Sequence, residues 1–423
     1  MISMGGRMSM LKHEATHVRL NPMNRRKADL NGKEIEIPEF VTPHAAQTAQ
    51  SFHRTFPDYQ PTPLVRLPGL ATRLGIRQLL VKDESYRFGL NAFKVLGAAY
   101  AMARYLCERL GRPIEEVDFA YLRSDEVKHQ LGDLTFVTAT DGNHGRAVAW
   151  AAAQLGQRAV VYLPKGSAAQ RVEAIRQNGA HAHVINGNYD EAVRLSDQMA
   201  RERGWQVIQD TAWEGYTDIP EWIMQGYTTM AAEAVHQITE QSPEEAPTHL
   251  FLQAGVGSMA AAVLGYYVAQ NPVNYPFTII VEPHAADCFY RSAEGDGRAV
   301  PAMGDLRTIM AGLACGEPNP LAWEILRDFA DAFASCPDSV AADGMRSLGI
   351  PTGRDQAVVS GESGAVGVGL LETLMQRDEW EAFRRAARLD ESSVVLFFST
   401  EGDTDRESYE RIVGIDRVTK GEA

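Results

Sequence analysis

The sequence predicts an α/β fold with two open, largely parallel sheets, each flanked by helices. Short apolar runs alternate with helical patterns over residues 134–210, and a second group of apolar runs follows in the C-terminal half. Strands that alternate with helices in this way form βαβ units, and such units build parallel sheets. A chain of 423 residues also exceeds one compact core and corresponds to two or three domains at roughly 150 residues each.

The first group contains four expected strands and three expected helices. The strands are LTFVTAT (134–140), RAVVYLP (158–164), AHAHVI (180–185) and WQVIQD (205–210). The helical patterns cover residues 145–155, 168–178 and 190–203. The regular order strand, helix, strand predicts one parallel sheet for this part of the chain.

The second group predicts another sheet. Its expected strands are HLFLQ (249–253), FTIIVEP (277–283) and the run SVVLFFST that ends at Thr400, and a helix is expected to begin near Met259. The segment QSPEEAP (241–247) is typical of a surface connection. We therefore expect a small βαβ domain (112–215) inserted into a large domain built from 1–111 and 216–423, with a ligand between them. The first 45 residues are polar and predict an arm or cap.

Composition excludes several classes of protein. Hydrophobic residues make up 45% and charged residues 23%, which is typical of a globular chain, and the formal charge of −14 disfavours nucleic acid and anionic membranes. No apolar run reaches membrane-spanning length and no secretory signal is visible, so a cytoplasmic location is expected. The four cysteines (107, 288, 315 and 336) lack zinc-binding spacing, and no metal site is predicted. Isolated thiols are the simpler interpretation, and a Cys288–Cys315 disulfide is the alternative.

Four motifs could carry chemistry, and the first is QAGVGSMAA (253–261). Gly255 and Gly257 remove side chains where a strand turns into a helix, so backbone N–H groups at the helix start could approach an anion. The natural interpretation is a phosphate site. The spacing Gly255-x-Gly257-x-x-Ala260 also loosely fits a dinucleotide fingerprint, with Glu282 as the ribose-binding acid, and a tight turn without any ligand is a third interpretation.

The second motif is TATDGNHGR (138–146), another turn from a strand to a helix. Asp141 and Asn143 lie on the turn, so one carboxylate and one carboxamide would stand beside a cluster of N–H groups. An Asp at a helix start is usually only an N-cap. His144 fits a packed or capping histidine better than a metal ligand, because no partner stands at ligand spacing.

The third motif surrounds Lys94, and the fourth ends the last apolar run. Lys94 follows Asn91–Phe93 in an apolar helical pattern, where desolvation should lower the lysine pKa and leave an amine able to form a Schiff base. A lysine in such a pattern can also simply reach out to solvent. Ser399 and Thr400 would lie at the carboxyl end of a strand, where ligands collect in open α/β sheets, followed by acids that could form a solvated loop.

Together, the four motifs meet four needs of pyridoxal phosphate. Its aldehyde needs an amine, its ring hydroxyl a carboxamide, its phosphate a group of N–H donors, and its pyridine nitrogen a hydrogen-bond partner. A dinucleotide would leave Lys94 and the turn at Asp141 and Asn143 unexplained. The joint occurrence therefore favours pyridoxal phosphate.

In order and spacing, these motifs resemble the fold-type II pyridoxal phosphate enzymes, which are like the β chain of tryptophan synthase. More narrowly, several blocks are similar to the diaminopropionate ammonia-lyases, which carry Asp in the turn where relatives usually have Ser or Ala. These blocks are RFGLNAFK, TDGNHGRAVAWAAAQLG, YLPKGSA, QDTAWEGYTDIPEWIMQGY, QAGVGSM, IMAGLACGEPNPLAWEIL, SGESGAVG and STEGDTD. The resemblance covers roughly residues 55–410 and implies a homodimer with the cofactor in the cleft between two domains.

The resemblance also implies residue roles. Lys94 would hold the cofactor as a Schiff base, Asn143 would contact the ring hydroxyl, and Ser399 or Thr400 would face the pyridine nitrogen. The phosphate would be bound by Gly255, Val256, Gly257 and Ser258.

The implied reaction is the α,β-elimination of D- or L-2,3-diaminopropionate to pyruvate and two ammonia molecules. Lys94, Asp141 and Asp190 are the candidate catalytic residues, and Asp190 could instead be the N-cap of the helix it precedes. Lys94 and Asp141 could lie on opposite sides of the substrate and serve different enantiomers. The candidate substrate-binding residues are Thr140, Asp141, Gly142, His144 and Asp190.

Three other functions stay open. A serine or threonine dehydratase would share the fold and cofactor, but its substrate has no β-cation for Asp141 to meet. A non-catalytic ligand-binding protein would have no use for Lys94, and an NAD-binding dehydrogenase leaves both Lys94 and Asp141 unexplained.

Overall fold

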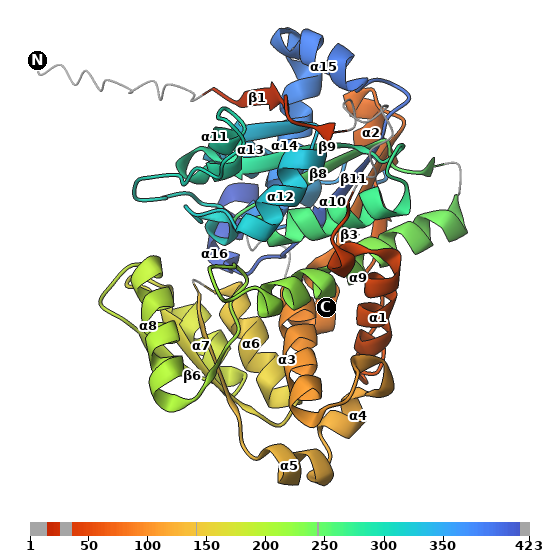
Figure 1. The fold of residues 1–423 in the computed structure, drawn as a ribbon. Coiled ribbons are helices and arrows are strands. Elements are labelled where there is room, and N and C mark those ends of the chain that lie inside the picture. Colours follow the sequence, from red (N-terminus) through yellow and green to blue (C-terminus); the bar gives the residue numbers. More distant parts are fainter. Residues whose placement is uncertain (1–14, 26–35, 141, 243–244, 415–423) are drawn as a thin grey trace, which may run out of the picture.

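Two sheets organise the chain in the computed structural model, which describes residues 15–25, 36–140, 142–242 and 245–414 (Figure 1). The larger sheet has seven strands in the order β1-β10-β9-β8-β11-β3-β2. Its strands are β1 (His17–Leu20), β2 (Leu64–Arg66), β3 (Gln78–Asp83), β8 (His249–Gln253), β9 (Phe277–Pro283), β10 (Ala332–Cys336) and β11 (Val394–Ser399). The five central strands are parallel, and the edge strands β1 and β2 run antiparallel to their neighbours. The sheet is therefore mixed, with a parallel centre.

The smaller sheet has four parallel strands in the order β6-β5-β4-β7. They are β4 (Thr135–Ala139), β5 (Arg158–Leu163), β6 (His181–Val184) and β7 (Gln206–Val207). The helices between them are α6 (Asn143–Gln154), α7 (Ala169–Gln177) and α8 (Tyr189–Arg203). All four strands and three helices expected in this region are present, with bounds that differ by a few residues. Each helix joins two parallel strands, as parallel pairing requires.

The remaining helices pack on the sheets or join them. The α-helices are α1 (Pro43–His53), α2 (Pro68–Leu74), α3 (Val95–Leu110), α4 (Phe119–Leu122), α5 (Asp125–Leu131), α9 (Asp218–Gln241), α10 (Ser258–Gln270), α11 (Cys288–Ser292), α12 (Pro320–Phe329), α13 (Asp338–Gly349), α14 (Glu362–Gln376), α15 (Glu381–Ala387) and α16 (Arg406–Val413). Short 3-10 turns are η2 (Glu39–Val41), η3 (Glu84–Gly89), η4 (Ile114–Glu116), η6 (His284–Ala286), η7 (Ala311–Leu313) and η8 (Asp378–Trp380). Figure 1 shows α6–α8 around the smaller sheet and α10–α14 around the larger one. No helix of the described residues is long and apolar enough to cross a membrane.

The inner strands of both sheets are buried on both faces. On β11, Leu396 and Phe398 belong to one core cluster and Val395 and Phe397 to another. Alternate residues of β5 are likewise divided between the first cluster and a third. Because parallel strands are covered on both sides, they form continuous apolar runs, and this explains why the sequence marks them so clearly.

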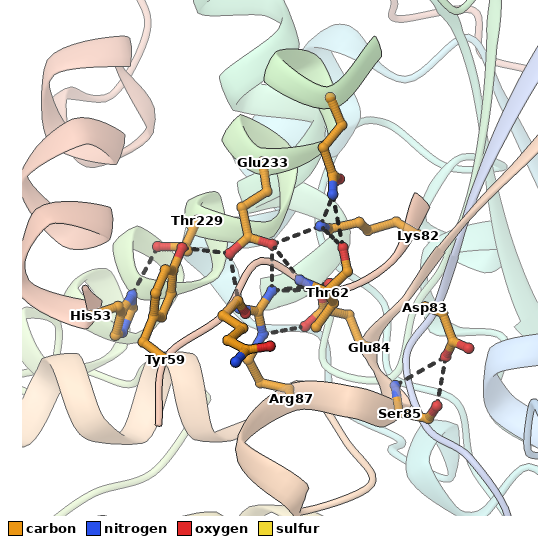
Figure 2. A network of polar contacts seen from close by, with 12 residues as sticks. His53, Tyr59, Thr62, Lys82, Asp83, Glu84, Ser85, Arg87, Thr229 and Glu233 are labelled. Atoms are coloured by element: carbon orange, nitrogen blue, oxygen red, sulfur yellow. Dashed lines mark hydrogen bonds and ion pairs between the residues drawn. The ribbon is translucent and has the colours of Figure 1, made fainter. Parts of the chain in front are cut away.

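A buried ion network anchors the segment that leads to Lys94 (Figure 2). Arg87 of η3 donates to Glu84 at 2.8 Å and to both carboxylate oxygens of Glu233 on α9, also at 2.8 Å. Lys82 at the end of β3 lies 2.6 Å from Glu233, and all four side chains are at most 1% exposed. Two cations and two anions balance within the network. It therefore ties β3 and η3 to α9 without leaving an unpaired buried charge.

The first described residues, which were expected to form an arm or cap, include a strand of the larger sheet. β1 pairs antiparallel with β10, from His17 opposite Ser335 to Leu20 opposite Ala332. Strands β1, β2, β3 and β10 were not expected. For β1 and β2 the reason is their length, because three or four residues are too few to show a period. The boundaries of the expected domains, 1–111 and 216–423 against 112–215, stay a prediction, although each sheet draws its strands from only one of these parts.

Candidate functional site

A cavity opens at the carboxyl ends of strands from both sheets. The space inside it is about 860 Å³ when the open solvent at its mouth is counted. Its lining comes from the loops after β4, β7, β8 and β11, from the segment before α3, and from α6, α8, α9, η7 and α14. The lining residues are Phe93, Lys94, Ala139, Thr140, Asn143, His144, Tyr189, Asp210, Tyr227, Gln253–Met259, Gly312–Cys315, Ser363, Thr400 and Glu401.

Lys94 stands immediately before α3 and not within it. Left-handed backbone at Phe88 (φ 49°), Gly89 (φ 69°) and Asn91 (φ 55°) keeps the preceding segment out of a helix, so α3 begins only at Val95. The chain therefore turns just ahead of Lys94 and presents its side chain to the cavity.

Asp210 is the partner of Lys94, and sequence reasoning did not select it. Lys94 Nζ donates to Asp210 Oδ2 at 2.5 Å. Burial acts to lower the lysine pKa, but attraction to Asp210 outweighs it and the pKa of Lys94 is raised. Burial acts to raise the pKa of Asp210, but attraction to Lys94 outweighs it and lowers the pKa to about 2. The expected lowering of the lysine pKa is therefore wrong, and Lys94 is an ammonium ion paired with a carboxylate.

The glycine loop between β8 and α10 has the form of an anion site. A Cβ atom at Gly257 (φ 90°) would lie 2.3 Å from Phe289, and one at Gly255 would lie 3.0 Å from the carbonyl oxygen of Gly312. No side chain caps the first N–H groups of α10, which begins at Ser258. Close approach of the backbone and uncapped N–H groups are what a phosphate requires.

Ser258 already has partners on both sides of its hydroxyl. Its Oγ donates to the carbonyl oxygen of Asp210 at 2.6 Å and accepts from Asn319 at 2.8 Å. The hydroxyl therefore joins the glycine loop to the segment that carries the partner of Lys94.

The turn after β4 brings several predicted residues to the cavity. Thr140 Oγ1 accepts from the Gly142 N–H at 2.9 Å, and Asn143, the first residue of α6, donates from Nδ2 to Glu401 Oε2 at 2.5 Å. His144 is buried, and its Nε2 lies 2.8 Å from the carbonyl oxygen of Ile208. Burial lowers the pKa of His144, so the ring is neutral and donates from Nε2. Asp141 lies outside the described residues.

Asp190 lies within α8, and its side chain is outside the description. The N-cap of α8 is Asn188, whose side chain accepts from the Glu191 N–H at 2.9 Å in a reciprocal capping box. The alternative role of Asp190 as the N-cap is therefore wrong. Its neighbour Tyr189 lines the cavity.

The end of β11 distinguishes Ser399 from Thr400. Thr400 lines the cavity, and its Oγ1 accepts from Gln253 at 2.8 Å, which leaves its hydroxyl hydrogen for another acceptor. Ser399 is 1% exposed, and its hydroxyl donates to Ser360 at 2.9 Å, away from the cavity lining. Of the two hydroxyls, only that of Thr400 borders the cavity.

Glu282 does not support a dinucleotide site, and the cysteines do not support a disulfide. Glu282 is fully buried and accepts from the N–H groups of Phe289 and Tyr290, so it caps α11 and does not line the cavity. Burial raises the pKa of Glu282 to about 8. Cys288 and Cys315 are both thiols, as are the other two cysteines, so no disulfide joins them.

The cavity contains polar atoms that lack a partner. Among the described residues, no hydrogen bond reaches Tyr227 OH, Ser363 Oγ or His144 Nδ1, although all three atoms are buried. Buried polar groups normally have partners, so these three indicate a polar ligand. Together with a lysine, a carboxamide, a glycine loop and a strand-end hydroxyl, the donor set fits pyridoxal phosphate.

Comparison with known proteins agrees with this donor set. Residues 55–400 match the family of pyridoxal-phosphate dependent enzymes. The chain is 55% identical to diaminopropionate ammonia-lyase of Escherichia coli strain K12 over 87% of this chain and 91% of that one. It is 49% identical to diaminopropionate ammonia-lyase of Salmonella typhimurium strain LT2 over 95% and 98% of the two chains. A crystal structure of the holo form of the Escherichia coli enzyme superimposes with a TM-score of 0.87 at 50% identity, covering 95% of this chain and 97% of that chain.

These findings confirm the predicted fold type II and its cofactor, pyridoxal phosphate. The chain belongs to the pyridoxal-phosphate dependent enzymes and, within them, to the diaminopropionate ammonia-lyases.

Proposed function

We propose that this enzyme converts 2,3-diaminopropionate and water into pyruvate and two molecules of ammonia. The single observation that carries the proposal is the pairing of Lys94 with Asp210 inside a cavity that also contains the glycine loop. High identity to two diaminopropionate ammonia-lyases over nearly the whole chain supports the choice of substrate.

Four groups around the cavity would hold the cofactor. Lys94 would bond its aldehyde carbon, Asn143 its ring hydroxyl, and the N–H groups of residues 255–258 its phosphate. Thr400 would donate its hydroxyl hydrogen to the pyridine nitrogen, which would then stay unprotonated. Bound pyridoxal phosphate supplies a carbonyl that condenses with amino groups and a ring that takes up electrons when a proton leaves Cα.

Proton transfer would be the task of Lys94 and Asp210. The Lys94 nitrogen would act as the base while it is not bonded to the cofactor, and Asp210 at 2.5 Å would hold it in place and stabilise its protonated form. Asp141 is proposed as the base for the other enantiomer. Asp190 and the residues Thr140, Gly142 and His144 are proposed to contact the substrate, with its carboxylate on the N–H groups of the 140–145 turn.

The direct test measures pyruvate and ammonia from the purified holoenzyme. D- and L-diaminopropionate, serine and threonine are supplied side by side, and we expect one pyruvate and two ammonia molecules for each diaminopropionate consumed. Faster turnover of serine or threonine than of either diaminopropionate isomer would contradict the proposal and favour a dehydratase.

We also propose that the enzyme is a cytoplasmic homodimer. The resemblance to its family supports the dimer, and four cysteines that are all thiols suit a reducing compartment. Light scattering coupled to size-exclusion chromatography measures the mass directly. A mass equal to one chain of 46.5 kDa would contradict the dimer.

A further inference from the structure

Among the described residues, one buried carboxylate of the cavity has no positively charged partner. Glu401 follows β11 and is 6% exposed. Its Oε2 accepts from Asn143 Nδ2 at 2.5 Å and from the Thr404 hydroxyl at 3.4 Å, and its Oε1 accepts from the Ser363 N–H at 3.3 Å. All three donors are neutral, and among the described residues no ion pair includes Glu401. By contrast, Asp210 and Glu233 each lie against a cation.

Glu401 lies where two cavities meet. It lines the main cavity and also a smaller one of about 280 Å³, counted to its mouth. Lys94, Asn143, His144 and Gly312 line both cavities as well. The smaller cavity adds Gly142, Ala311 and Arg171. The smaller cavity therefore places the Glu401 carboxylate, a group suited to a cation, beside the reacting lysine.

The lysine of the cavity does not neutralise Glu401, because Lys94 is paired with Asp210. A buried carboxylate without a counter-ion is costly, and the cost is relieved when a cationic ligand enters. An amino acid with a second ammonium group supplies that cation.

We propose that Glu401 binds the β-ammonium group of the substrate and selects diamino acids over amino acids with a neutral side chain. This proposal rests on the proposed function. The carboxylate favours the protonated form of the β-nitrogen, which is the form that can leave. When the Cα proton passes to the base, its electron pair forms the Cα–Cβ double bond. The Cβ–N bond then breaks, and its electrons leave with the nitrogen as neutral ammonia. No further reactant is needed for this step.

The test replaces the charge of Glu401 and keeps its shape. In the Glu401→Gln holoenzyme, kcat/KM for diaminopropionate should fall about 100-fold, because a buried charge pair with the substrate is lost. For β-chloroalanine, whose leaving group is an anion, kcat/KM should stay unchanged or rise. Equal losses for both substrates, or no loss for either, would overturn the proposal.

Two controls separate this proposal from others. Glu362→Gln changes a neighbouring acid that is also buried but bonds to Ser408 at 2.7 Å outside the cavity lining, and it should leave the ratio of the two substrates unchanged. The absorption spectrum of the bound cofactor should be the same in all three proteins. If it is lost in Glu401→Gln, the residue holds the cofactor and the proposal is wrong. A wild-type enzyme that releases pyruvate from β-chloroalanine but not from diaminopropionate would instead contradict the proposed function.

Discussion

Lys94 Nζ lies 2.5 Å from Asp210 Oδ2, and each side chain moves the pKa of the other away from neutrality. The lysine comes from the larger sheet's side of the cavity, before α3, and the aspartate follows the last strand of the smaller sheet. One ion pair therefore joins the two sheets at the centre of the site, and it makes the stability of the cofactor-free protein depend on pH.

The first prediction concerns that dependence. Asp210 has a pKa of about 2 against an ordinary 3.8, so its contribution to the free energy of unfolding is present above pH 3.8 and lost as the pH falls toward 2. Lys94 has a raised pKa, so its contribution is complete below pH 10.5 and lost as the pH rises through the raised value. Asp210→Asn should remove the dependence at acid pH and about 3 kcal/mol near neutral pH. It should also reverse the dependence that comes from Lys94, because burial without Asp210 lowers the lysine pKa and stability is then gained as the pH rises through that value.

Urea unfolding of the cofactor-free protein across this pH range measures the effect. Asp343→Asn, which removes an exposed pair with Arg346, is the matched control and should leave the pH profile unchanged. Parallel profiles for wild type and Asp210→Asn would show that the pair carries no such linkage.

The second prediction tests the glycine loop. Gly257→Ala adds a Cβ at 2.3 Å from the Phe289 ring, on left-handed backbone with φ of 90°. We expect weaker cofactor binding and a loss of about 1–3 kcal/mol in stability from overpacking. Gly353→Ala has the same backbone strain at φ of 65° with no atom near the new Cβ, and should affect stability alone. Equal cofactor affinities in the two variants, measured by fluorescence titration, would argue against the loop as the phosphate site.

The third prediction separates two neighbouring hydroxyls. Thr400→Val removes the hydroxyl that borders the cavity, so the absorption maximum of the bound cofactor should shift and turnover should fall about 10-fold or more. Ser399→Ala removes a hydroxyl that donates to Ser360 in the interior, so it should change stability and leave the spectrum as it is. The reverse pattern would assign the pyridine nitrogen to Ser399.

The fourth prediction concerns the buried ion network. Glu233→Gln leaves Lys82 and Arg87 with one buried anion between them, and should lower the free energy of unfolding by about 3–5 kcal/mol. Glu294→Gln, which breaks a half-exposed pair with Arg19, should cost at most about 1 kcal/mol. Chemical denaturation at pH 7 compares the two variants, and equal losses would show that burial of the network adds nothing.

The fifth prediction concerns Asp141. If its carboxylate is the base for one enantiomer, Asp141→Asn should abolish turnover of D-diaminopropionate and keep turnover of the L isomer and binding of the cofactor. Separate kinetics with the two enantiomers give the answer. Unchanged kcat for the D isomer would remove Asp141 from the proposed mechanism.

The sequence predicted the βαβ region well and the contacts of the site poorly, for physical reasons. Strands such as β8 and β9 are buried on both faces, so their continuous apolar runs are visible in the sequence. Asp210 ends the predicted strand WQVIQD. Its position at the carboxyl end of a parallel strand could have indicated a site residue, because ligands bind at that end of the strands. Glu401 lies among acids that resemble a solvated loop, and only the folded chain shows that it is buried.

Lys94 illustrates the limit of local reasoning. The apolar residues around it correctly indicated a buried lysine, and burial alone would lower its pKa. The sign of the shift is reversed by a carboxylate 116 residues further along the chain. No pattern near Lys94 could reveal that partner, because the contact exists only once both sheets have formed.

Strand β1 affects how readily the edge of the larger sheet can pair with other molecules. It occupies the outer side of β10, whose N–H and C=O groups would otherwise offer an open template to strands of other molecules. Arg19 of β1 places a charged side chain at this edge, where it forms an ion pair with Glu294 and lies 4.5 Å over the ring of Tyr290. Because β1 has only four residues and carries the charged Arg19, the edge that it forms is a poorer template for the strands of other molecules than the longer β10 would be.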